Sequence, residues 1–158
     1  MEAASLYNHI SSKQAIIKEL LMDIALEFTE GMDLILDLEV SDLEKLEALI
    51  GLHVDISVEK TDAISLVPNE WVHLKEPNLQ QFLKLRDVYE KNFLSIISSF
   101  LSEEPISSLD PKVALFSILS SLRWLYSWYS KYDGKSVETL KEELIQSLLY
   151  GLKNEERP

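Results

Sequence analysis

The chain has 158 residues, of which 46% are hydrophobic, with 4 glycines, 5 prolines and no cysteine. This length and apolar fraction are sufficient for one domain with its own core. The 27 acidic and 15 basic side chains give a net charge of −12, which excludes a protein that binds polyanions over its whole surface. The absence of cysteine excludes disulfides, thiolate zinc sites and cysteine nucleophiles.

Charged residues interrupt every apolar stretch before it reaches the roughly 20 residues that a membrane span requires. The N-terminus also lacks the basic segment and the uninterrupted apolar run of a secretory signal. We therefore expect a cytoplasmic protein without membrane contact. Long stretches with a 3.6-residue apolar period, together with the scarcity of glycine and proline, predict an all-α fold.

The first helix signal lies at Ser11. Ser11 and Gln14 have the spacing of a capping box, so we expect a helix to begin one or two residues after Ser11 and to continue to Leu36. Residues 1–11 would then be the end of a separate short helix. The buried face of the long helix is predicted to consist of Ile17, Leu20, Leu21, Ile24, Phe28, Met32 and Ile35.

Further helix starts are predicted where a capping residue or an N-terminal proline precedes an apolar pattern. They are Ser41 with Glu44, Glu76 with Pro77, Asp110 with Pro111, and Ser136. A shorter segment at about residues 64–74 is interrupted by Pro68. We expect the helix from residue 111 to run to residue 129 or 130, which gives six main helices and no strand in all.

Glu70 and His73 have the three-residue spacing of carboxylate and imidazole ligands in di-iron helical bundles. Such a site needs a second pair of this kind, but Ile50 and Leu6 stand three residues before the other two histidines. We therefore expect a surface pair, and neither a metal nor another cofactor. Because the sequence also lacks a Gly-x-Ser-x-Gly elbow and a glycine-rich phosphate loop, we do not expect an enzyme.

Arg86 lies on the apolar, largely aromatic face of the helix predicted to follow residue 77. A buried guanidinium without an anionic partner is very costly. Two interpretations are open: a structural ion pair with Glu70 or Glu90, or a carboxylate or phosphate of a ligand. Arg123, among leucine and aromatic neighbours, poses the same choice less sharply.

The last two predicted helices carry more apolar surface than one neighbour can cover. Small side chains on both helices would let two backbones approach closely. Either these helices pack within one chain, or two helices from each of two chains form the four-helix bundle of a homodimer, which we favour. The predicted interface residues are Ser117, Ser121, Trp128, Leu144, Leu148 and Gly151.

Residues 4–13, ASLYNHISSK, resemble the end of the recognition helix of TetR-family transcriptional repressors and the start of the helix that follows it. The family pattern is a small residue, Ser or Thr, Leu, Tyr, any residue, His or Tyr, an apolar residue, and a short capped turn that ends in Lys. The downstream plan also resembles this family: a long connecting helix, a helical ligand-binding core, and two C-terminal helices that end in SWYSKYDGKSVETLKEELIQSLLYGL.

The resemblance implies roles for residues of the opening segment. Tyr7 and Lys13 would contact DNA phosphates, while Asn8 and His9 would lie near the DNA backbone or the base edges. The DNA-binding residues implied in an intact protein are Ser5, Tyr7, Asn8, His9 and Lys13. A family DNA-binding domain has three helices, and this sequence holds only the end of the third. We therefore expect an N-terminally truncated chain that binds DNA only if the missing helices are present.

The resemblance also implies a small-molecule effector bound between the connecting helix and the next three helices. The segment NEWVHLKEPNLQQFLKLRDVYEKNF is similar to the core of family members that sense acyl-coenzyme A thioesters or related lipid-like anions. The predicted ligand-pocket residues are Trp71, Arg86, Tyr89, Phe93, Phe116 and Trp124. Each of them could instead be an ordinary core residue.

We interpret the sequence as the effector-sensing, dimerising core of a TetR-like transcriptional repressor, with the all-α fold of a TetR-like C-terminal ligand-binding domain. Its predicted parts are a recognition-helix remnant at residues 1–11, a connector, ligand-binding and dimerisation domain at residues 12–153, and a tail at residues 154–158. The alternative is a helical ligand-binding or protein-interaction module without DNA-binding function.

Overall fold

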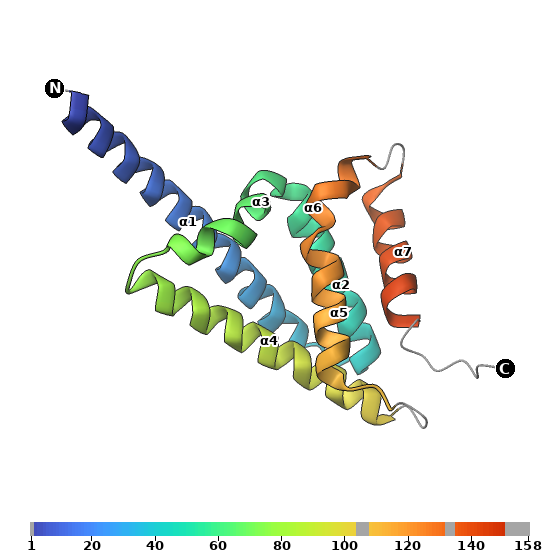
Figure 1. The fold of residues 1–158 in the computed structure, drawn as a ribbon. Coiled ribbons are helices and arrows are strands. Elements are labelled where there is room, and N and C mark those ends of the chain that lie inside the picture. The colour runs from blue at the N-terminus through green and yellow to red at the C-terminus, as the bar shows by residue number, and fades with distance from the viewer. Residues whose placement is uncertain (1, 104–107, 132–134, 151–158) are drawn as a thin grey trace.

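Figure 1 shows the computed structural model of the chain, which describes residues 2–103, 108–131 and 135–150. These residues contain helices and connecting loops, with no strand among them. The α-helices are α1 (Glu2–Leu36), α2 (Asp42–Glu59), α3 (Thr61–Glu70), α4 (Asn78–Glu103), α5 (Pro111–Arg123), α6 (Leu125–Trp128) and α7 (Val137–Leu149). Two short 3-10 helices, η1 (Trp71–His73) and η2 (Tyr129–Lys131), follow α3 and α6. The predicted all-α fold with six main helices is confirmed, and α6 adds a single turn.

α1 is the longest helix, and only its C-terminal half is covered by other elements. Every residue from 4 to 16 is exposed, and burial begins at Ile17. From there Leu21, Ile24 and Met32 are buried against the neighbouring helices α2, α3 and α4, whereas the N-terminal end extends away from them (Figure 1). We call residues 4–16 the exposed arm. None of the described helices combines the length and apolarity that crossing a membrane requires.

The helix boundary predicted at Ser11 is wrong, because α1 continues through this position without a break. The Ser11 hydroxyl donates to the carbonyl of Asn8 at 2.9 Å, one turn back in the same helix, and so does not cap a new helix. The exposed arm has no buried contact that could fix a turn here, so continuous helical hydrogen bonds satisfy its backbone groups. The predicted end of this helix at Leu36 is confirmed.

The main core lies where α1, α2, α4 and α5 meet. Its most deeply buried side chains include Met32, Leu49, Phe93 and Leu122. α1 and α2 come very close at Gly31, where a Cβ atom would lie 2.6 Å from the side chain of Leu52. α7 packs on α2 at the outer side of this core (Figure 1) and contributes the buried Leu149.

Side-chain caps begin three of the helices at predicted positions. The Ser41 hydroxyl accepts from the Glu44 amide at 3.3 Å, and the Glu44 carboxylate accepts from the Ser41 amide at 3.0 Å. The Ser41 hydroxyl also donates to the Glu44 carboxylate at 2.6 Å, and this bond, together with the bond from the Ser41 amide, holds the pKa of Glu44 below its ordinary value. Asp110 caps α5 and Ser136 caps α7. These starts are confirmed, whereas α4 begins at Asn78, one residue later than predicted.

The single helix predicted over residues 111–130 is wrong, because the chain turns at Trp124, between α5 and α6. Trp124 has φ −94° and ψ 0°, outside the usual helical range. The turn redirects the chain so that Leu125 is completely buried beside α2 and α7. It also brings the Tyr129 hydroxyl within 2.9 Å of the Thr61 hydroxyl at the start of α3. Contacts between distant elements thus outweigh the local preference for one continuous helix.

Replacing Ser41 with alanine should destabilise the protein, because the α2 amide that Ser41 caps loses its partner. We expect the free energy of unfolding, measured by chemical denaturation, to fall by about 1 kcal/mol. Ser98→Ala is the matched control, since the Ser98 hydroxyl only donates to the Leu94 carbonyl within α4 and alanine is a good helix former. An equal loss of stability in both variants would contradict the role of the cap.

Candidate ligand-binding cavity

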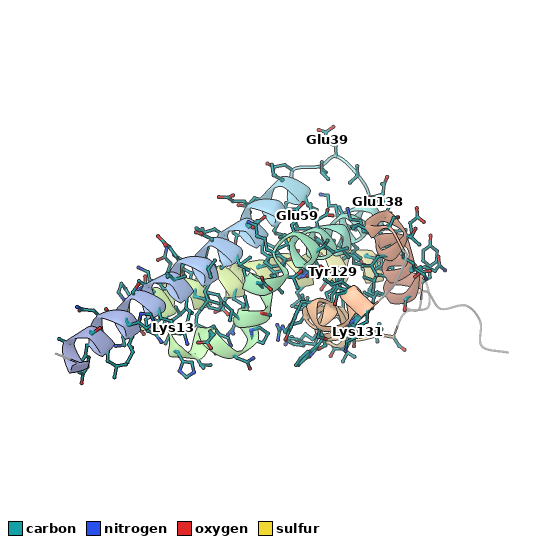
Figure 2. All side chains as sticks on the ribbon, turned by 90° about the horizontal axis from the view of Figure 1, so that it is seen from above. Lys13, Glu39, Glu59, Tyr129, Lys131 and Glu138 are labelled. Carbon is teal, nitrogen blue, oxygen red and sulfur yellow. The ribbon has the colours of Figure 1, made fainter. Side chains whose placement is uncertain are left out.

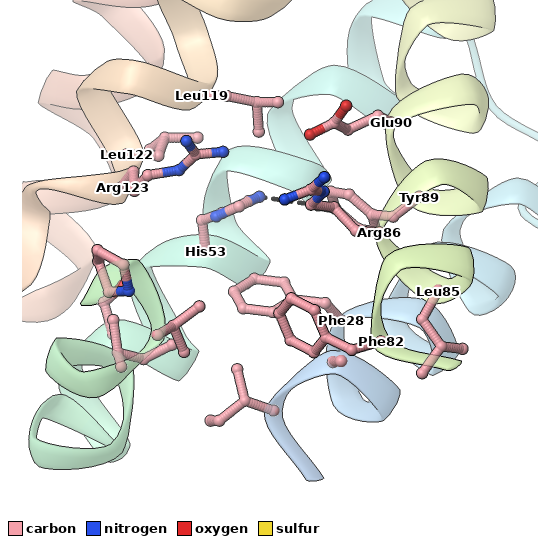
Figure 3. A pocket seen from close by; sticks show the side chains of 16 residues that line it. Phe28, His53, Phe82, Leu85, Arg86, Tyr89, Glu90, Leu119, Leu122 and Arg123 are labelled. Carbon is pink, nitrogen blue, oxygen red and sulfur yellow. Dashed lines mark hydrogen bonds between the residues drawn. The ribbon is translucent and has the colours of Figure 1, made fainter. Parts of the chain in front are cut away.

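A cavity of about 150 Å³ lies between α1, α2, α3, α4 and α5, and Figure 3 shows the side chains that line it. Its apolar wall includes Ile24, Phe28, Ile64, Phe82, Leu119 and Leu122. Its polar lining consists of His53, Ser57, Arg86, Tyr89, Glu90 and Arg123. Five successive α-helices therefore converge on one mostly apolar space with a small set of polar groups.

An aromatic group forms one side of this cavity. The ring of Phe28 lies 4.6 Å from the ring of His53 and 5.7 Å from the ring of Tyr89, measured between centroids. Phe93 is completely buried behind them, with its ring centroid 6.1 Å from that of Tyr89 and 6.4 Å from that of His53. Because these rings come from α1, α2 and α4, their contacts fix the positions of three helices around the cavity.

His53 of α2 and Tyr89 of α4 share a hydrogen bond, with 2.8 Å between His53 Nε2 and the Tyr89 hydroxyl oxygen. Burial, together with the positive charge of Arg123, lowers the pKa of His53 to about 3. Burial also raises the pKa of Tyr89. Both side chains are therefore uncharged at neutral pH. His53 is partly buried and lines the cavity.

Arg86 of α4 and Arg123 of α5 bring two guanidinium groups to the cavity beside this pair (Figure 3). The Arg86 guanidinium carbon lies 4.8 Å from the ring centroid of Trp71, a cation–π contact. Within the described residues neither arginine has a carboxylate within 4.0 Å. The ion pair of Arg86 with Glu70 or Glu90 that the sequence allowed is thus not formed, although Glu90 lines the same cavity.

The structure brings Arg86 and Tyr89, two of the predicted pocket residues, into the cavity wall. Trp71 lies against Arg86, and Phe93 lies behind Tyr89, so both support the wall without lining it.

Phe116 and Trp124 do not line the cavity. Their side chains are 54% and 57% exposed. α5 turns Leu115, Ile118 and Leu122 inward, and this leaves positions 116 and 124 on its outer side. Neither residue is an ordinary core residue either, since both side chains are exposed.

Sequence reasoning does not find Phe28 and His53 as lining residues. Phe28 belongs to the apolar stripe of a long helix, which is typical of a core residue, and His53 is a single histidine beside another such stripe. The informative feature is the cluster that they form with Tyr89, which joins three segments that are far apart in the sequence. It becomes visible only when the three helices are placed together.

Small residues predicted for a dimer interface lie on the exposed side of α5. Ser117 and Ser121 are both exposed, and the Ser121 hydroxyl donates to the Ser117 carbonyl at 3.0 Å. Phe116 and Trp124 stand on the same side of the helix. Together these four residues form what we call the outer face of α5, a strip of small side chains with exposed aromatic rings at its ends.

The other predicted interface residues lie around α6 and α7. Leu144 and Leu148 are partly buried against the main core, and Trp128 is partly buried beside Leu125. All three therefore have neighbours within this chain. Gly151 lies outside the described residues.

The residues with implied DNA-binding roles all lie on the exposed arm. They are Ser5, Tyr7, Asn8, His9 and Lys13. Tyr7 is 75% exposed. Figure 2 shows Lys13 toward the N-terminal end of α1, while Glu39, in the loop after this helix, lies at the opposite end. The structure thus groups these residues on one helical segment, well away from the main core.

Glu70 and His73, considered as metal ligands from their spacing, lie at the end of α3 and in η1. Among the described residues no group of three His, Asp or Glu side chains is placed to hold a metal ion. His73 is exposed.

Comparison with known proteins gives the family of this fold. The family model described as the tetracyclin repressor-like, C-terminal domain matches residues 39–152. No curated protein matches the chain. Because the matched domain spans most of the sequence, the chain belongs to the TetR family of transcriptional regulators, and the matched part is its C-terminal domain.

Solved structures show the same fold. The TetR family transcriptional regulator PfmR from Thermus thermophilus is 22% identical with a TM-score of 0.75, over 98% of this chain and 82% of its own. The ketosteroid transcriptional regulator KstR2 of Mycobacterium tuberculosis is 18% identical with a TM-score of 0.82, over 96% and 79%. AibR, in complex with isovaleryl coenzyme A and operator DNA, is 20% identical with a TM-score of 0.72, over 91% and 78%.

The stability of the protein should fall as the pH drops from about 6.5, because the unfolded chain binds a proton at His53 that the folded chain excludes. An unfolded histidine has a pKa of about 6.5, and the pKa of folded His53 is about 3. Its contribution is therefore fully present above the unfolded pKa and is lost progressively below it. Denaturation between pH 7 and 5 should show a slope that approaches about 1.4 kcal/mol per pH unit.

His53→Gln is the control for this measurement, because glutamine keeps a hydrogen-bonding group near Tyr89 and does not titrate. The pH dependence of its unfolding free energy should be shallower than that of the wild type by most of this slope. The same slope in both proteins would assign the effect to other groups.

Proposed function

We propose that this chain is the effector-binding and dimerising core of a TetR-like transcriptional repressor, and that its effector is an anion with a small apolar group. One observation carries the proposal: a mostly apolar cavity is lined by two arginines that form no ion pair within the described residues. Membership of a family of transcriptional regulators supports the regulatory role.

The charge pattern favours an anionic ligand. The protein carries a net charge of −12, so carboxylates are abundant, yet in the described structure Arg86 and Arg123 approach the cavity without such a partner. The effect of Arg123 on the pKa of His53 indicates that positive potential reaches into the cavity. A carboxylate or phosphate placed beside these guanidinium groups would form charge-assisted hydrogen bonds.

The size of the cavity limits the apolar part of the ligand. A volume of about 150 Å³ is comparable to that of an engineered protein cavity that holds benzene, so it accommodates about six carbon atoms. Arg123 is exposed and also lines the cavity, and this places the opening beside it. A larger anionic head group would therefore remain outside.

A short acyl-coenzyme A has this combination of a small apolar group and a large anionic head, and a related lipid-like anion is the broader class. AibR, a protein of similar fold, has been solved with isovaleryl coenzyme A bound.

α1 provides the proposed route from ligand to DNA. Ile24 and Phe28 of α1 line the cavity, and the same helix continues into the exposed arm with Tyr7 and Lys13. About 20 residues separate Phe28 from Tyr7, which corresponds to about 30 Å along a helix. In an intact regulator, a small tilt of α1 on ligand binding would change the spacing of the two arms of a dimer and lower operator affinity.

The outer face of α5 is the proposed centre of the homodimer. Its serines leave room for the close approach of a second helix, and the exposed rings of Phe116 and Trp124 would be covered there. The partly buried Leu144 and Leu148 would extend this surface onto α7, so that two helices from each chain meet.

Replacing Arg86 with methionine should weaken the binding of hexanoyl-coenzyme A by about 10- to 100-fold, because one charge-assisted hydrogen bond is lost. Isothermal titration calorimetry measures this change. Lys84→Met is the matched control, since Lys84 is an exposed cation on the same helix that does not line the cavity, and its affinity should equal that of the wild type. Unchanged affinity with lower stability in the Arg86 variant would assign this arginine to the fold alone.

Sedimentation should give a particle of twice the chain mass of 18.1 kDa. Phe116→Glu should shift it to a monomer at micromolar concentration, because a carboxylate would have to be buried in the bundle. Leu34→Glu, at a 71% exposed position on α1, should remain dimeric. A monomeric wild type at micromolar concentration would refute the dimer.

A further inference from the structure

The polar groups of the cavity are arranged in an order that restricts the ligand further. Figure 3 shows His53 between Arg123 and the ring of Phe28, and the ring of Phe28 is 4.6 Å from that of His53. Passing inward from the exposed Arg123, a ligand would thus meet a positive charge, then an uncharged polar pair, then an aromatic wall. A free fatty acid has an anionic group and an apolar tail, but it has no separate uncharged polar group to match the His53–Tyr89 pair.

The hydrogen atoms of the His53–Tyr89 pair can be counted without knowing the tautomer. A neutral imidazole carries one N–H and the phenol carries one O–H, so the pair has two donor hydrogens. One of them is used in the bond between Nε2 and the hydroxyl oxygen. If Tyr89 donates, the remaining donor is His53 Nδ1; if His53 donates, it is the Tyr89 hydroxyl.

This remaining donor has no acceptor within the described part of the protein. Neither His53 nor Tyr89 makes a second hydrogen bond there, and no buried polar side-chain atom in that part is left without a partner. The second ring nitrogen of His53, Nδ1, is therefore accessible, and His53 lines the cavity. We take Tyr89 as the donor of the shared bond, because the other tautomer would leave the hydroxyl hydrogen of the buried Tyr89 without an acceptor. Nδ1 then carries the remaining hydrogen, and a ligand atom that fills the cavity and displaces water must accept it, since an unmatched donor is costly when buried.

The acceptor that suits this position is uncharged. A ligand carboxylate or phosphate is attracted more strongly to the guanidinium groups of Arg86 and Arg123 than to a neutral pair. A carbonyl oxygen accepts one hydrogen bond without bringing a charge next to the ring of Phe28.

We propose that His53 and Tyr89 form a subsite for an uncharged carbonyl oxygen, so that the effector is an acyl conjugate in which a carbonyl joins a short apolar tail to an anionic head. This inference rests on the proposed function, because it takes the anionic, partly apolar ligand as given. It adds that an ester-like or thioester-like carbonyl is required, and that the corresponding ether or thioether is discriminated against.

The test compares hexanoyl-coenzyme A with S-hexyl-coenzyme A, a thioether that keeps the head group and tail but has two hydrogens in place of the carbonyl oxygen. Calorimetric titration of the wild type should show that the thioester binds at least about tenfold more tightly. In the double variant His53→Leu/Tyr89→Phe, which has no donor left in the pair, the two ligands should bind with equal affinity.

Tyr129→Phe is the matched control, because Tyr129 also joins two elements through a hydroxyl pair, with Thr61 at 2.9 Å, but does not line the cavity. Its preference for the thioester should equal that of the wild type. A preference that persists in the double variant would overturn the assignment to His53 and Tyr89.

The wild type alone decides the inference even if the double variant does not fold. Equal affinity of the wild type for thioester and thioether would overturn the carbonyl subsite and leave the anionic effector intact. If neither ligand binds more tightly than coenzyme A itself, the proposed effector class fails and the subsite fails with it.

Discussion

The burial of the second half of α1 is the interaction on which the rest of the structure depends. Its apolar stripe begins at Ile17, and α2, α3 and α4 all pack against it. Burying one large aliphatic or aromatic side chain contributes about 1.5–3 kcal/mol, and the stripe repeats this over about five turns. It thereby holds a 35-residue helix whose first half has no such contacts. Because the stripe also supplies Ile24 and Phe28 to the cavity, one rigid element forms both a core wall and a cavity wall.

The interior of the cavity combines an apolar surface with a polar pair that cannot ionise at neutral pH. His53 and Tyr89 share a hydrogen bond at 2.8 Å, which lowers the cost that each group would incur if buried alone. The surrounding rings of Phe28 and Phe93 hold the imidazole in place and keep the local dielectric low. The charges, on Arg86 and Arg123, lie at the side of this region. This separation of uncharged and charged groups in the cavity matches ligands whose uncharged polar group and anionic group are also separate.

Local signals made the starts of α2, α5 and α7 predictable, whereas long-range contacts decided what the sequence could not show. Ser41, Asp110 and Ser136 cap helices because a cap involves only residues two or three positions apart. The break at Trp124 depends on the burial of Leu125 against distant helices, so its local sequence does not show it. The arginine and tyrosine of the cavity could be predicted from the period of α4. The cavity itself could not be predicted, because the contacts among residues 28, 53 and 89 depend on how three helices are placed.

The exposed arm gives the molecule an uneven distribution of charge. Residues 4–16 contain one lysine and no acidic residue, although the chain has 27 acidic side chains in all. Residues 17–36, the rest of α1, contain one lysine and five acidic residues, so the net charge changes sign along this helix. A polyanion attracts the arm and repels the rest of α1, and so favours the orientation in which the arm faces it. Rotational diffusion would be biased toward that orientation before any contact forms, within the screening length of about 8 Å at physiological salt.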